Sequence, residues 1–239
     1  MAKPILADLH THTLASGHAY GTILENARAA ADAGLKLYGF AEHGPATPAA
    51  CDPFYFCNMK VIPRQLYGVT VLRGCELNLL DDGTYDLPEK YVSRLDYCYI
   101  GLHSVAFHTG TREENTRKLV KLLPHEKILF VSHPDDDNTP LDYDVLVPAC
   151  REHHVALEVN NSSFFKLDRR KNVLENYRYM LSLCSRLRVP VMIGSDAHFP
   201  TDVGQVPLAY EFVQASGFDE DLILNLDPQR VLSFIHLEP

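Results

Sequence analysis

Residues 4–12 read PILADLHTH, and this stretch contains the pattern that decides the fold. An apolar run of strand length leads directly into two histidines, His10 and His12. Residues two apart on a strand point to the same face, so both imidazoles can reach one ion. Five more apolar runs lead into side chains that bind metals: 35–41 into His43, 69–72 into Glu76, 97–102 into His103, 128–131 into His133, and 190–194 into Asp196 and His198. This repetition indicates one assembly rather than six separate accidents.

Helices are expected between these strands, which predicts an α/β fold. Thr22 and Glu25 form the capping-box pattern that begins a helix, and Thr111 and Glu114 repeat it. A seventh apolar strand, 155–159, ends without a metal-binding side chain. Further helices are expected at residues 142–154, 172–187 and 203–216 and after Pro228. The alternation predicts a mostly parallel sheet of seven strands, open or closed, whose strand ends meet in one pocket.

Two segments depart from the alternation of strands and helices. Residues 77–86 are typical of a β-hairpin with its turn at Asp82 and Gly83. Residues 44–64 are rich in proline and aromatic side chains, which indicates a long loop or a short helix near the mouth of the pocket.

Length and composition favour one domain spanning residues 1–239. No linker or repeat divides the chain, and no apolar run approaches the roughly 18 residues of a membrane span. The first strand begins near Pro4, which leaves no room for a signal peptide, and the six cysteines form no C-x-x-C pair. We therefore expect a cytoplasmic protein with reduced thiols and no membrane contact.

The net charge limits the partners that the protein could bind. Acidic residues outnumber basic ones by 31 to 22, which gives a formal charge of −9. This balance disfavours the binding of long nucleic acids through their phosphates. Small phosphorylated substrates remain compatible with it, because bound metal ions reverse the field locally.

Eight short motifs occur in order along the chain, and together they resemble a known family. They are DLHTHT at 8–13, HAY at 18–20, EHG at 42–44, RGCE at 73–76, GLH at 101–103, SHP at 132–134, EVNNSS at 158–163 and GSDAH at 194–198. The chain resembles the PHP (polymerase and histidinol phosphatase) domain family of metal-dependent phosphoesterases, especially its small bacterial YcdX-type phosphatases, almost from end to end. The resemblance implies a distorted, TIM-barrel-like β/α barrel of seven strands, with a metal site at the carboxyl ends of the strands.

The resemblance also implies a trinuclear metal centre and the residues that hold it. One ion would be bound by His10, His12, Glu76 and Asp196, a second would share Glu76 with His103 and His133, and a third would be bound by His18, His43 and His198. All nine positions carry the residue types of the family. Many relatives have aspartate where this chain has Glu42, but a strand neighbour of His43 is expected to face away from the metals. Imidazole and carboxylate ligands suit zinc, and also manganese or iron.

The donor set favours phosphate ester hydrolysis on physical grounds as well. Glu76 and Asp196 are the only anions among the nine donors, so three divalent ions would leave roughly four positive charges in the pocket. A phosphate monoester is a polyanion that such a pocket attracts. The ions would activate a hydroxide for attack on phosphorus, and the two carboxylates would be catalytic through the metals they bind. We expect a phosphatase acting on small phosphorylated molecules.

Three other groups of side chains are candidates for a role in the site. Asp8 shares the strand face of His10 and is expected to accept a hydrogen bond from a ligand imidazole, with a turn or capping role as the alternative. His108, close in sequence to His103, and the remaining histidines outside the motifs are expected not to bind metal. The acidic run 135–137 is expected to be a solvated loop rather than a metal site.

Four residues are candidates for contacts with the substrate. Arg64 and Arg73 are basic residues near the motifs, and their planar guanidinium groups could clamp a phosphate or instead form structural ion pairs. Asn161 and Ser163 follow the seventh strand, where they could contact a substrate or only complete the hydrogen bonds of a loop.

Three alternative functions remain open. Amidohydrolases, which cleave C–N bonds, also begin with H-x-H on a first barrel strand, but they usually have eight strands and a differently placed lysine or carboxylate. An exonuclease or phosphodiesterase acting on short nucleic acids is possible within the same phosphoester chemistry. A metal-binding module without catalytic activity is disfavoured, because all nine ligand types are present.

Overall fold

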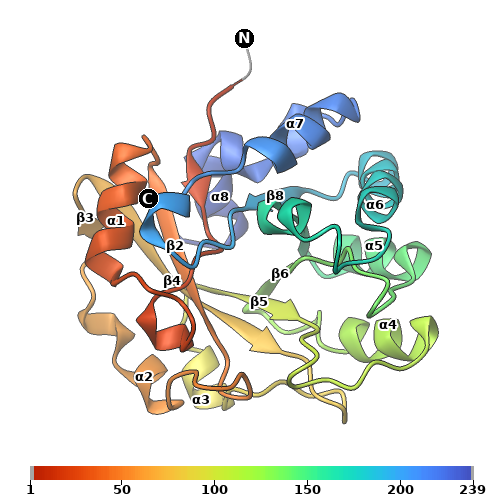
Figure 1. The fold of residues 1–239 in the computed structure, drawn as a ribbon, viewed down its shortest axis with the longest axis horizontal. Helices are drawn as coiled ribbons and strands as arrows, with labels where there is room; N and C mark the ends of the chain where they lie inside the picture. The colour runs from red at the N-terminus through yellow and green to blue at the C-terminus, as the bar shows by residue number, and fades with distance from the viewer. Residues whose placement is uncertain (1–2, 238–239) are drawn as a thin grey trace.

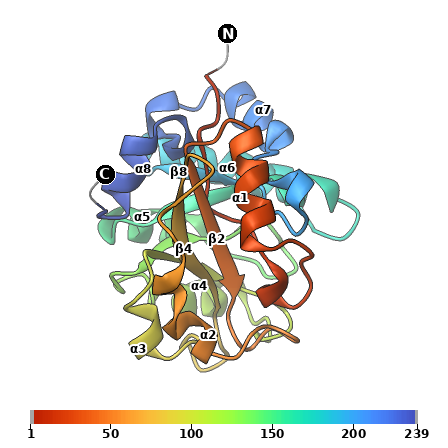
Figure 2. The same ribbon diagram turned by 90° about the vertical axis from the view of Figure 1, so that its left-hand side faces the viewer.

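A computed structural model describes residues 3–237, and its centre is a parallel β-sheet curved into a nearly closed barrel (Figure 1). The strands lie in the order β1 (Ala7–Asp8), β2 (Leu37–His43), β4 (Val69–Asn78), β5 (Tyr97–Gly101), β6 (Ile128–Val131), β7 (Ala156–Asn160) and β8 (Val191–Gly194). A short strand, β3 (Gln65–Leu66), pairs antiparallel with the beginning of β4. Figure 2 shows the long strands β2 and β4 side by side, with α1 beside them.

The first and last segments of the sheet meet just beyond the ends of β1 and β8. Thr11 forms a parallel bridge with Ala197, and the backbone N–H of His12 donates to the carbonyl of Ala197 at 2.8 Å. The N–H of Asp196 donates to the carbonyl of His10, also at 2.8 Å. The predicted seven-stranded β/α barrel is therefore confirmed. These bonds bring the first and last donor motifs of the sequence together.

Helices cover the outside of the barrel and connect consecutive strands (Figure 1). They are α1 (Ile23–Asp32), α2 (Phe54–Cys57), α3 (Glu89–Val92), α4 (Arg112–Val120), α5 (Tyr143–Glu152), α6 (Val173–Leu187), α7 (Pro207–Ala215) and α8 (Pro228–Phe234). Both expected capping boxes are present, at Thr22 with Glu25 and at Thr111 with Glu114. The helix expected from residue 203 begins instead at Pro207. Proline lacks an N–H and therefore suits the first turn of a helix.

The inside of the barrel is filled with apolar and aromatic side chains, so it contains no channel. Buried members of this inner core include Leu9, Leu37, Leu72, Tyr99 and Phe130, and side chains of α8 close it from the amino-terminal end. A second, larger core lies between the sheet and the surrounding helices. The apolar filling leaves only the carboxyl ends of the strands for polar chemistry.

Two local expectations differ from the structure. β4 continues to Asn78, so Glu76 lies within the strand rather than beyond its end. The hairpin expected at 77–86 is a tight turn with a single bridge, between Leu79 and Tyr85. The segment 44–64 contains α2 and a 3₁₀ turn, as expected for a loop with a short helix.

Among residues 3–237, no helix is long and apolar enough to cross a membrane.

Candidate metal centre

The nine expected donor side chains form one cluster at the carboxyl ends of the strands, with Glu76 at its centre. The Glu76 carboxylate is buried, and β4 points it into the ring of strand ends. Five imidazole nitrogens surround its two oxygens: from Oε2, His43 Nδ1 is 2.9 Å, His10 Nε2 3.4 Å and His12 Nε2 3.6 Å away, and from Oε1, His133 Nε2 is 3.0 Å and His103 Nε2 3.2 Å away. One carboxylate thus joins donors from four strands.

Asp196 forms the second anionic point of the cluster. Its Oδ1 lies 3.2 Å from His12 Nε2 and 3.7 Å from His10 Nε2. The backbone φ of Asp196 is 56°, and that of His133 is 29°. Residues other than glycine rarely adopt this left-handed region, and such strain collects at functional sites. Both strained residues belong to the donor cluster.

His18 and His198 form an arrangement that a shared cation, either a metal ion or a proton, explains. Their Nε2 atoms are 3.0 Å apart. Nδ1 of His18 faces the carbonyl of Ser16 at 3.2 Å, and Nδ1 of His198 faces the carbonyl of Asp196 at 2.8 Å. A carbonyl oxygen only accepts hydrogen bonds, so each Nδ1 carries the hydrogen. Two neutral rings would then turn lone pairs toward each other, which is favourable only with a positive ion between them.

Buried donor atoms without partners show that the cluster fits a metal. His10 Nε2, His12 Nε2, His43 Nδ1 and Glu76 Oε2 are buried and lie close to one another, but none of them forms a hydrogen bond within residues 3–237. Buried polar atoms almost always have one. Ligand atoms bound tetrahedrally to zinc would lie roughly 3.4 Å apart, close to the separations in the cluster. In three overlapping donor groups the ligand atoms lie within 4.8 Å of one another: His12, His43 and His198; His10, His12 and Glu76; and His43, Glu76 and His103.

The charge states of the donors also suit metal binding. Burial would raise the pKa of Glu76, but the imidazoles around it, His103 foremost, hold that pKa well below its ordinary value. The pKa of Asp196 is lowered in the same way, chiefly through His12. Burial lowers the pKa of His12 and of His103, whereas nearby carboxylates outweigh burial and raise the pKa of His10 and His43, from which a metal would have to displace protons. Anionic carboxylates and neutral imidazoles are the forms that bind metals.

Glu158 holds His10 in place, and the sequence analysis did not assign it this role. Nδ1 of His10 donates to Glu158 Oε1 at 2.6 Å, which turns the bare Nε2 toward the cluster. Glu158 Oε2 accepts from the backbone N–H of His133 at 2.7 Å. A Cβ on Gly194 would lie 2.0 Å from Glu158 Oε1, so only glycine leaves room for this carboxylate. The available signal was a charged residue inside an apolar strand.

His12 is oriented by a short chain of hydrogen bonds. The Ser16 hydroxyl donates to Glu42 Oε2 at 2.6 Å and lies 3.0 Å from His12 Nδ1, which therefore donates to it. Glu42 also accepts from the backbone N–H of Thr13 at 3.0 Å. The Glu42 carboxylate thus faces away from the donor cluster, as expected, and fixes the orientation of His12 through Ser16.

Asp8 does not bind a ligand imidazole, so this expectation was wrong. Its carboxylate accepts from the Ser195 hydroxyl at 2.5 Å and from the backbone N–H groups of Gly204 at 2.9 Å and His10 at 3.3 Å. The physical reason is that Glu158 already occupies the Nδ1 side of His10. Asp8 instead fastens the backbone where the first and last strands meet.

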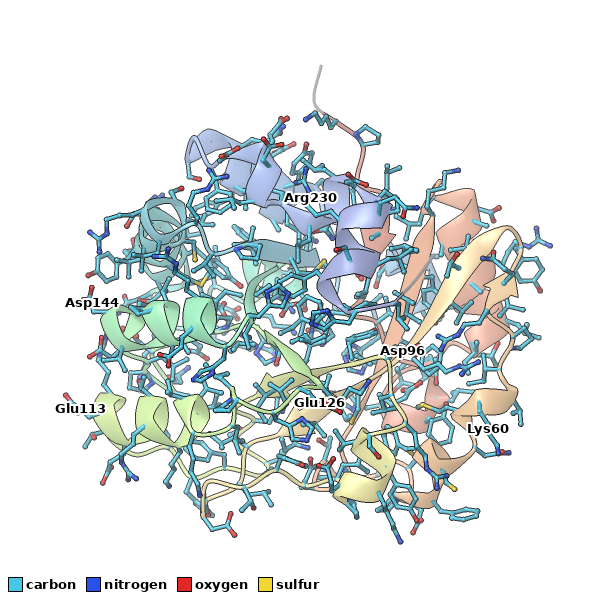
Figure 3. All side chains as sticks on the ribbon, turned by 180° about the vertical axis from the view of Figure 1, so that it is seen from behind. Lys60, Asp96, Glu113, Glu126, Asp144 and Arg230 are labelled. Atoms are coloured by element: carbon cyan, nitrogen blue, oxygen red, sulfur yellow. The ribbon has the colours of Figure 1, made fainter. Side chains whose placement is uncertain are left out.

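The two arginines expected near the substrate lie elsewhere. Arg64 is paired with Asp96, which is labelled in Figure 3, at the amino-terminal end of β4 and β5. Arg73 donates to the carbonyl of Ile62 at 2.5 Å. Neither lines the cleft of the donor cluster, so of the two alternatives the structural ion pair holds for Arg64, and a phosphate contact is not supported for Arg64 or Arg73. Arg64 and Nη2 of Arg73 instead bind the β3–β4 region together.

Asn161 and Ser163 are also turned away from the cluster. Oδ1 of Asn161 accepts from the backbone N–H of Ala209 in α7 at 3.0 Å. The Ser163 side chain is buried, and its backbone N–H donates to Oδ1 of Asn160 at 3.2 Å. The 3₁₀ turn after β7 presents Ser162 to the cleft in their place. The substrate role proposed for Asn161 and Ser163 is therefore not supported.

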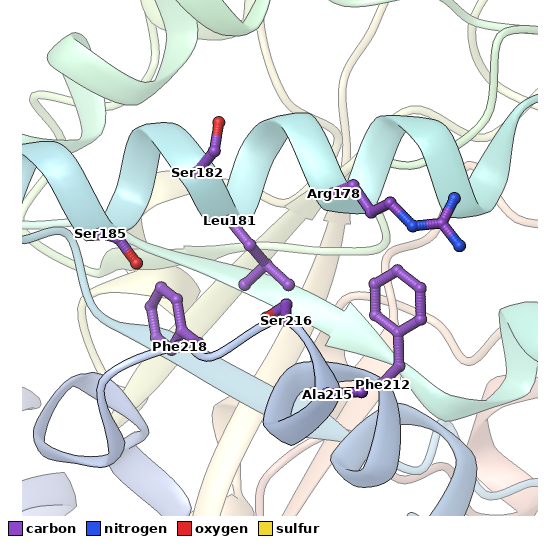
Figure 4. Close-up of a pocket in the computed structure, with 8 residues that line it drawn as sticks. All are labelled: Arg178, Leu181, Ser182, Ser185, Phe212, Ala215, Ser216 and Phe218. Carbon is purple, nitrogen blue, oxygen red and sulfur yellow. The ribbon is translucent and has the colours of Figure 1, made fainter.

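The donors open into a cleft of about 490 Å³. It is lined by His18, His43, Glu76, His103, His133, Ser162, Lys166, Arg170, Asp196, His198 and Asp202. The basic members, Lys166 and Arg170, come from the loop after β7 and were not singled out from the sequence. A further hollow, shown in Figure 4, lies between α6 and α7 and is lined by apolar, hydroxyl and arginine side chains without any metal-binding group.

The remaining acidic and histidine candidates have structural partners. His108 is exposed and pairs with Asp81, 2.7 Å away, outside the donor cluster. The loop 135–137 is not simply solvated: Asp135 is buried and accepts from Arg170 at 2.6 Å. That expectation was wrong because the loop after β7 covers it.

The fold is a parallel barrel, and a cluster of histidine and carboxylate side chains lies at the carboxyl ends of its strands. These two features define the class of protein to which the chain belongs: barrels with a candidate metal site at that end. Within that class, the family model of the PHP domain matches residues 8–198, and the chain belongs to the PHP domain family. The resemblance expected from the motifs is confirmed.

Relatives at the sequence level carry the name of a phosphatase. The chain is 37% identical over 231 residues to a "Probable phosphatase" of Clostridium botulinum (strain Langeland), covering 96% of this chain and 94% of that one. It is 39% identical over 229 residues to a "Probable phosphatase" of Clostridium novyi (strain NT), covering 95% and 93%. The expectation of a phosphatase of this family is thereby confirmed.

Solved structures share the fold at low sequence identity. The histidinol phosphate phosphatase of Lactococcus lactis, complexed with zinc, L-histidinol and phosphate, aligns with a TM-score of 0.61 and 16% identity, covering 90% of this chain and 95% of that chain. A chain of an archaeal ribonuclease P bound to mature tRNA aligns with a TM-score of 0.61 and 15% identity, covering 96% and 90%. These two neighbours differ in the molecules they bind, so the likeness shows the fold and does not identify a substrate.

Proposed function

We propose that the protein is a metal-dependent phosphatase that hydrolyses small phosphorylated molecules at a trinuclear centre. The observation that carries the proposal is the group of buried, partnerless donor atoms around Glu76. They have the spacing and the chemistry of ligands for zinc, with manganese or iron as alternatives. Zinc and phosphate in the Lactococcus histidinol phosphate phosphatase support the same combination.

The charge of the site favours a phosphate ester as the substrate. Glu76 and Asp196 are the only anionic donors, so three divalent ions would leave roughly four positive charges at the bottom of the cleft. The protein around the cleft carries a formal charge of −9. Attraction is therefore local, since exposed charges are screened beyond about 8–10 Å at physiological salt. A small dianion benefits from such a field, and a long polyanion also meets a repelling surface.

The residues of the chain hold and orient the site. Divalent ions bound there would supply activation of a water molecule and neutralisation of the phosphoryl oxygens. Glu158 and Ser16 fix the tautomers of His10 and His12, so that the bare Nε2 atoms face the cluster. Donors from both ends of the sequence complete one site, which supports a single domain over residues 1–239.

Metal dependence is the first test of this proposal. We expect two to three transition-metal ions per chain in freshly purified protein, and release of inorganic phosphate from a panel of small esters that a chelator abolishes and added zinc or manganese restores. Elemental analysis with less than one ion per chain, together with activity that a chelator does not change, would refute it. Amide substrates in the same panel detect an amidohydrolase.

Substrate size is the second test. With the same metal and salt, kcat/KM should be higher for a sugar phosphate or amino-alcohol phosphate than for an oligonucleotide of about ten residues, because the acidic surface repels a long strand. Faster cleavage of the oligonucleotide would reject the small-molecule substrate and favour an exonuclease.

A further inference from the structure

The cleft has a feature that the metal donors do not explain: two basic side chains on its wall. Lys166 and Arg170 line the cleft together with the donor cluster, and Lys166 Nζ lies 3.8 Å from Asp196 Oδ2. Arg170 also borders an adjoining cleft of about 520 Å³. Cationic side chains facing a pocket that gathers metal ions would be repelled by those ions. The arrangement is favourable when an anion lies between the metals and the two side chains.

Arg170 is held in a fixed position by a buried carboxylate. The Asp135 side chain is fully buried, and its Oδ1 accepts from Arg170 Nη1 at 2.6 Å. Only 18% of the Arg170 side chain is exposed. A guanidinium group has five N–H donors, and this is the one hydrogen bond of Arg170 side-chain atoms among the described residues. The other donors remain available to a ligand in the cleft that Arg170 lines.

The two loops that carry this pair are bound to each other. The Asn176 side chain donates to the Asp135 carbonyl at 2.9 Å, and the N–H of Asp137 donates to the Lys171 carbonyl at 3.0 Å. The N–H of Lys171 donates to Asp136 Oδ1 at 2.9 Å. Arg170 is therefore pre-organised before any ligand arrives, which strengthens an electrostatic contact because little reorganisation is needed.

Building on the phosphatase function proposed above, we propose that Arg170, positioned by Asp135, and Lys166 form an anion grip that selects phosphate monoesters over diesters. The grip would contact the phosphoryl oxygens that do not face the metals. A monoester carries close to two negative charges near neutral pH and has free oxygens for both sides. A diester carries one charge, and its second ester group would occupy the place of an oxygen that the grip contacts.

The test uses the metal-loaded protein and the variants Lys166→Gln and Arg170→Gln. A matched control is Arg169→Gln, the neighbouring arginine, whose side chain is 84% exposed. Three quantities are measured: kcat and KM for p-nitrophenyl phosphate and for bis(p-nitrophenyl) phosphate, the affinity for inorganic phosphate by calorimetry, and the metal content. Each grip variant should raise KM for the monoester and weaken phosphate binding by roughly 10- to 100-fold. The loss should be clearly smaller for the diester than for the monoester, and the metal content and the control variant should change little.

Two variants keep the test valid if Arg170→Gln fails to fold. Lys166 is partly exposed, and its buried partner Asp196 keeps His12 Nε2 3.2 Å away, so Lys166→Gln does not leave that carboxylate without a partner. Arg170→Lys leaves a cation beside Asp135 but loses the planar fork, and it should recover only part of the phosphate affinity. Unchanged phosphate binding in both, or equal losses on monoester and diester, would overturn the grip. A wild-type protein that binds phosphate but hydrolyses no ester would instead overturn the phosphatase proposal alone.

Discussion

The two ends of the barrel treat charged side chains in opposite ways. At the amino-terminal end, Asp96 accepts from Arg64 Nη2 at 2.7 Å and from the backbone N–H of Arg73 at 2.7 Å, so its charge is satisfied. At the carboxyl end, several buried atoms of His10, His12 and Glu76 have no hydrogen-bond partner within residues 3–237, whereas toward the amino-terminal end Arg73 Nε is a single such atom beside these satisfied groups. Satisfied polar groups hold a fold together, whereas unsatisfied buried ones indicate a missing ligand.

Left-handed backbone conformations occur at both ends of the barrel, but among residues 3–237 those within the donor cluster are all at the carboxyl end. His133 and Asp196 have φ values of 29° and 56°, and both are donors at the carboxyl end. Such conformations cost about 1–3 kcal/mol each and persist only where the surroundings impose them. The carboxyl end therefore combines strain with missing partners, which is the expected signature of a binding site rather than of a structural element.

Of the substitutions considered, Glu76→Gln should cause the largest loss of activity and of metal binding at the carboxyl end. The amide would point an N–H toward the imidazole nitrogens that now surround a carboxylate, so more than one ion should be lost. We expect kcat/KM to fall by roughly 10³-fold and the metal content per chain to drop, measured by phosphate release and elemental analysis. His108→Ala, in an exposed histidine paired with Asp81, should be nearly silent. Equal activity of the two variants would remove Glu76 from the centre of the site.

Glu158→Gln should have the next largest effect, because it acts one contact away from the metals. Loss of the charge behind His10 should reduce metal affinity by roughly 10- to 100-fold, measured by competition with a chromogenic chelator. Glu89→Gln is a matched control, since Glu89 also pairs with a histidine, His125, at 2.8 Å but far from the cluster. If both variants lost the same affinity, the change would reflect a general effect of removing acidic charge.

The sequence predicted the donors far better than their supports. The position of a donor follows from strand periodicity: a buried strand ends and its next polar side chain enters the pocket, as with His103 and His133. The supports depend on how separate loops meet. Glu158 reaches His10 only because Gly194 leaves space between neighbouring strands. Such a meeting depends on the relative position of two strands and has no local sequence pattern.

The positions of the basic residues were also not predictable from local sequence. Proximity in sequence to the donor motifs suggested Arg64 and Arg73, but Arg64 lies beside the beginning of β4 and Arg73 lies within β4 before Glu76, so both are toward the other end of the barrel. Lys166 and Arg170 lie in a loop whose path is set by its hydrogen bonds to the loop after β6. The overall barrel followed from the alternation of strands and helices, because that alternation is local.

Acidification should weaken metal binding in a predictable direction. Burial lowers the pKa of His10 and His43, but the carboxylates around them, Glu158 and Glu76 for His10 and Glu76 for His43, outweigh it and raise both above 6.5. In the metal-free protein, these protonated rings beside carboxylates add stability at low pH that is lost as pH rises through the raised pKa values. Metal binding must displace those protons, so affinity should fall about tenfold per pH unit for each proton.

Thermal unfolding with and without zinc measures this dependence. The increase in Tm that zinc produces should be larger at about pH 8 than at about pH 6, since the metal then competes with fewer protons. The metal-free protein serves as its own control at each pH. A zinc effect on Tm that is independent of pH would mean that the ligands carry no protons to displace.

The smallest effect on activity is expected at the amino-terminal end. Arg64→Ala leaves Asp96 with the N–H of Arg73 as its remaining partner, but the Arg64 side chain is already 43% exposed. Solvent screening limits the loss to about 1 kcal/mol, or about 2–4 °C in Tm for a chain of this size. Because Arg64 borders no part of the metal cleft, kcat and KM should stay within about twofold of the wild type. A loss of about 1 kcal/mol in transition-state stabilisation would change the rate by more than that. A raised KM for phosphate esters with an unchanged Tm would reverse the comparison: it would make Arg64 a substrate contact and the amino-terminal end part of the site.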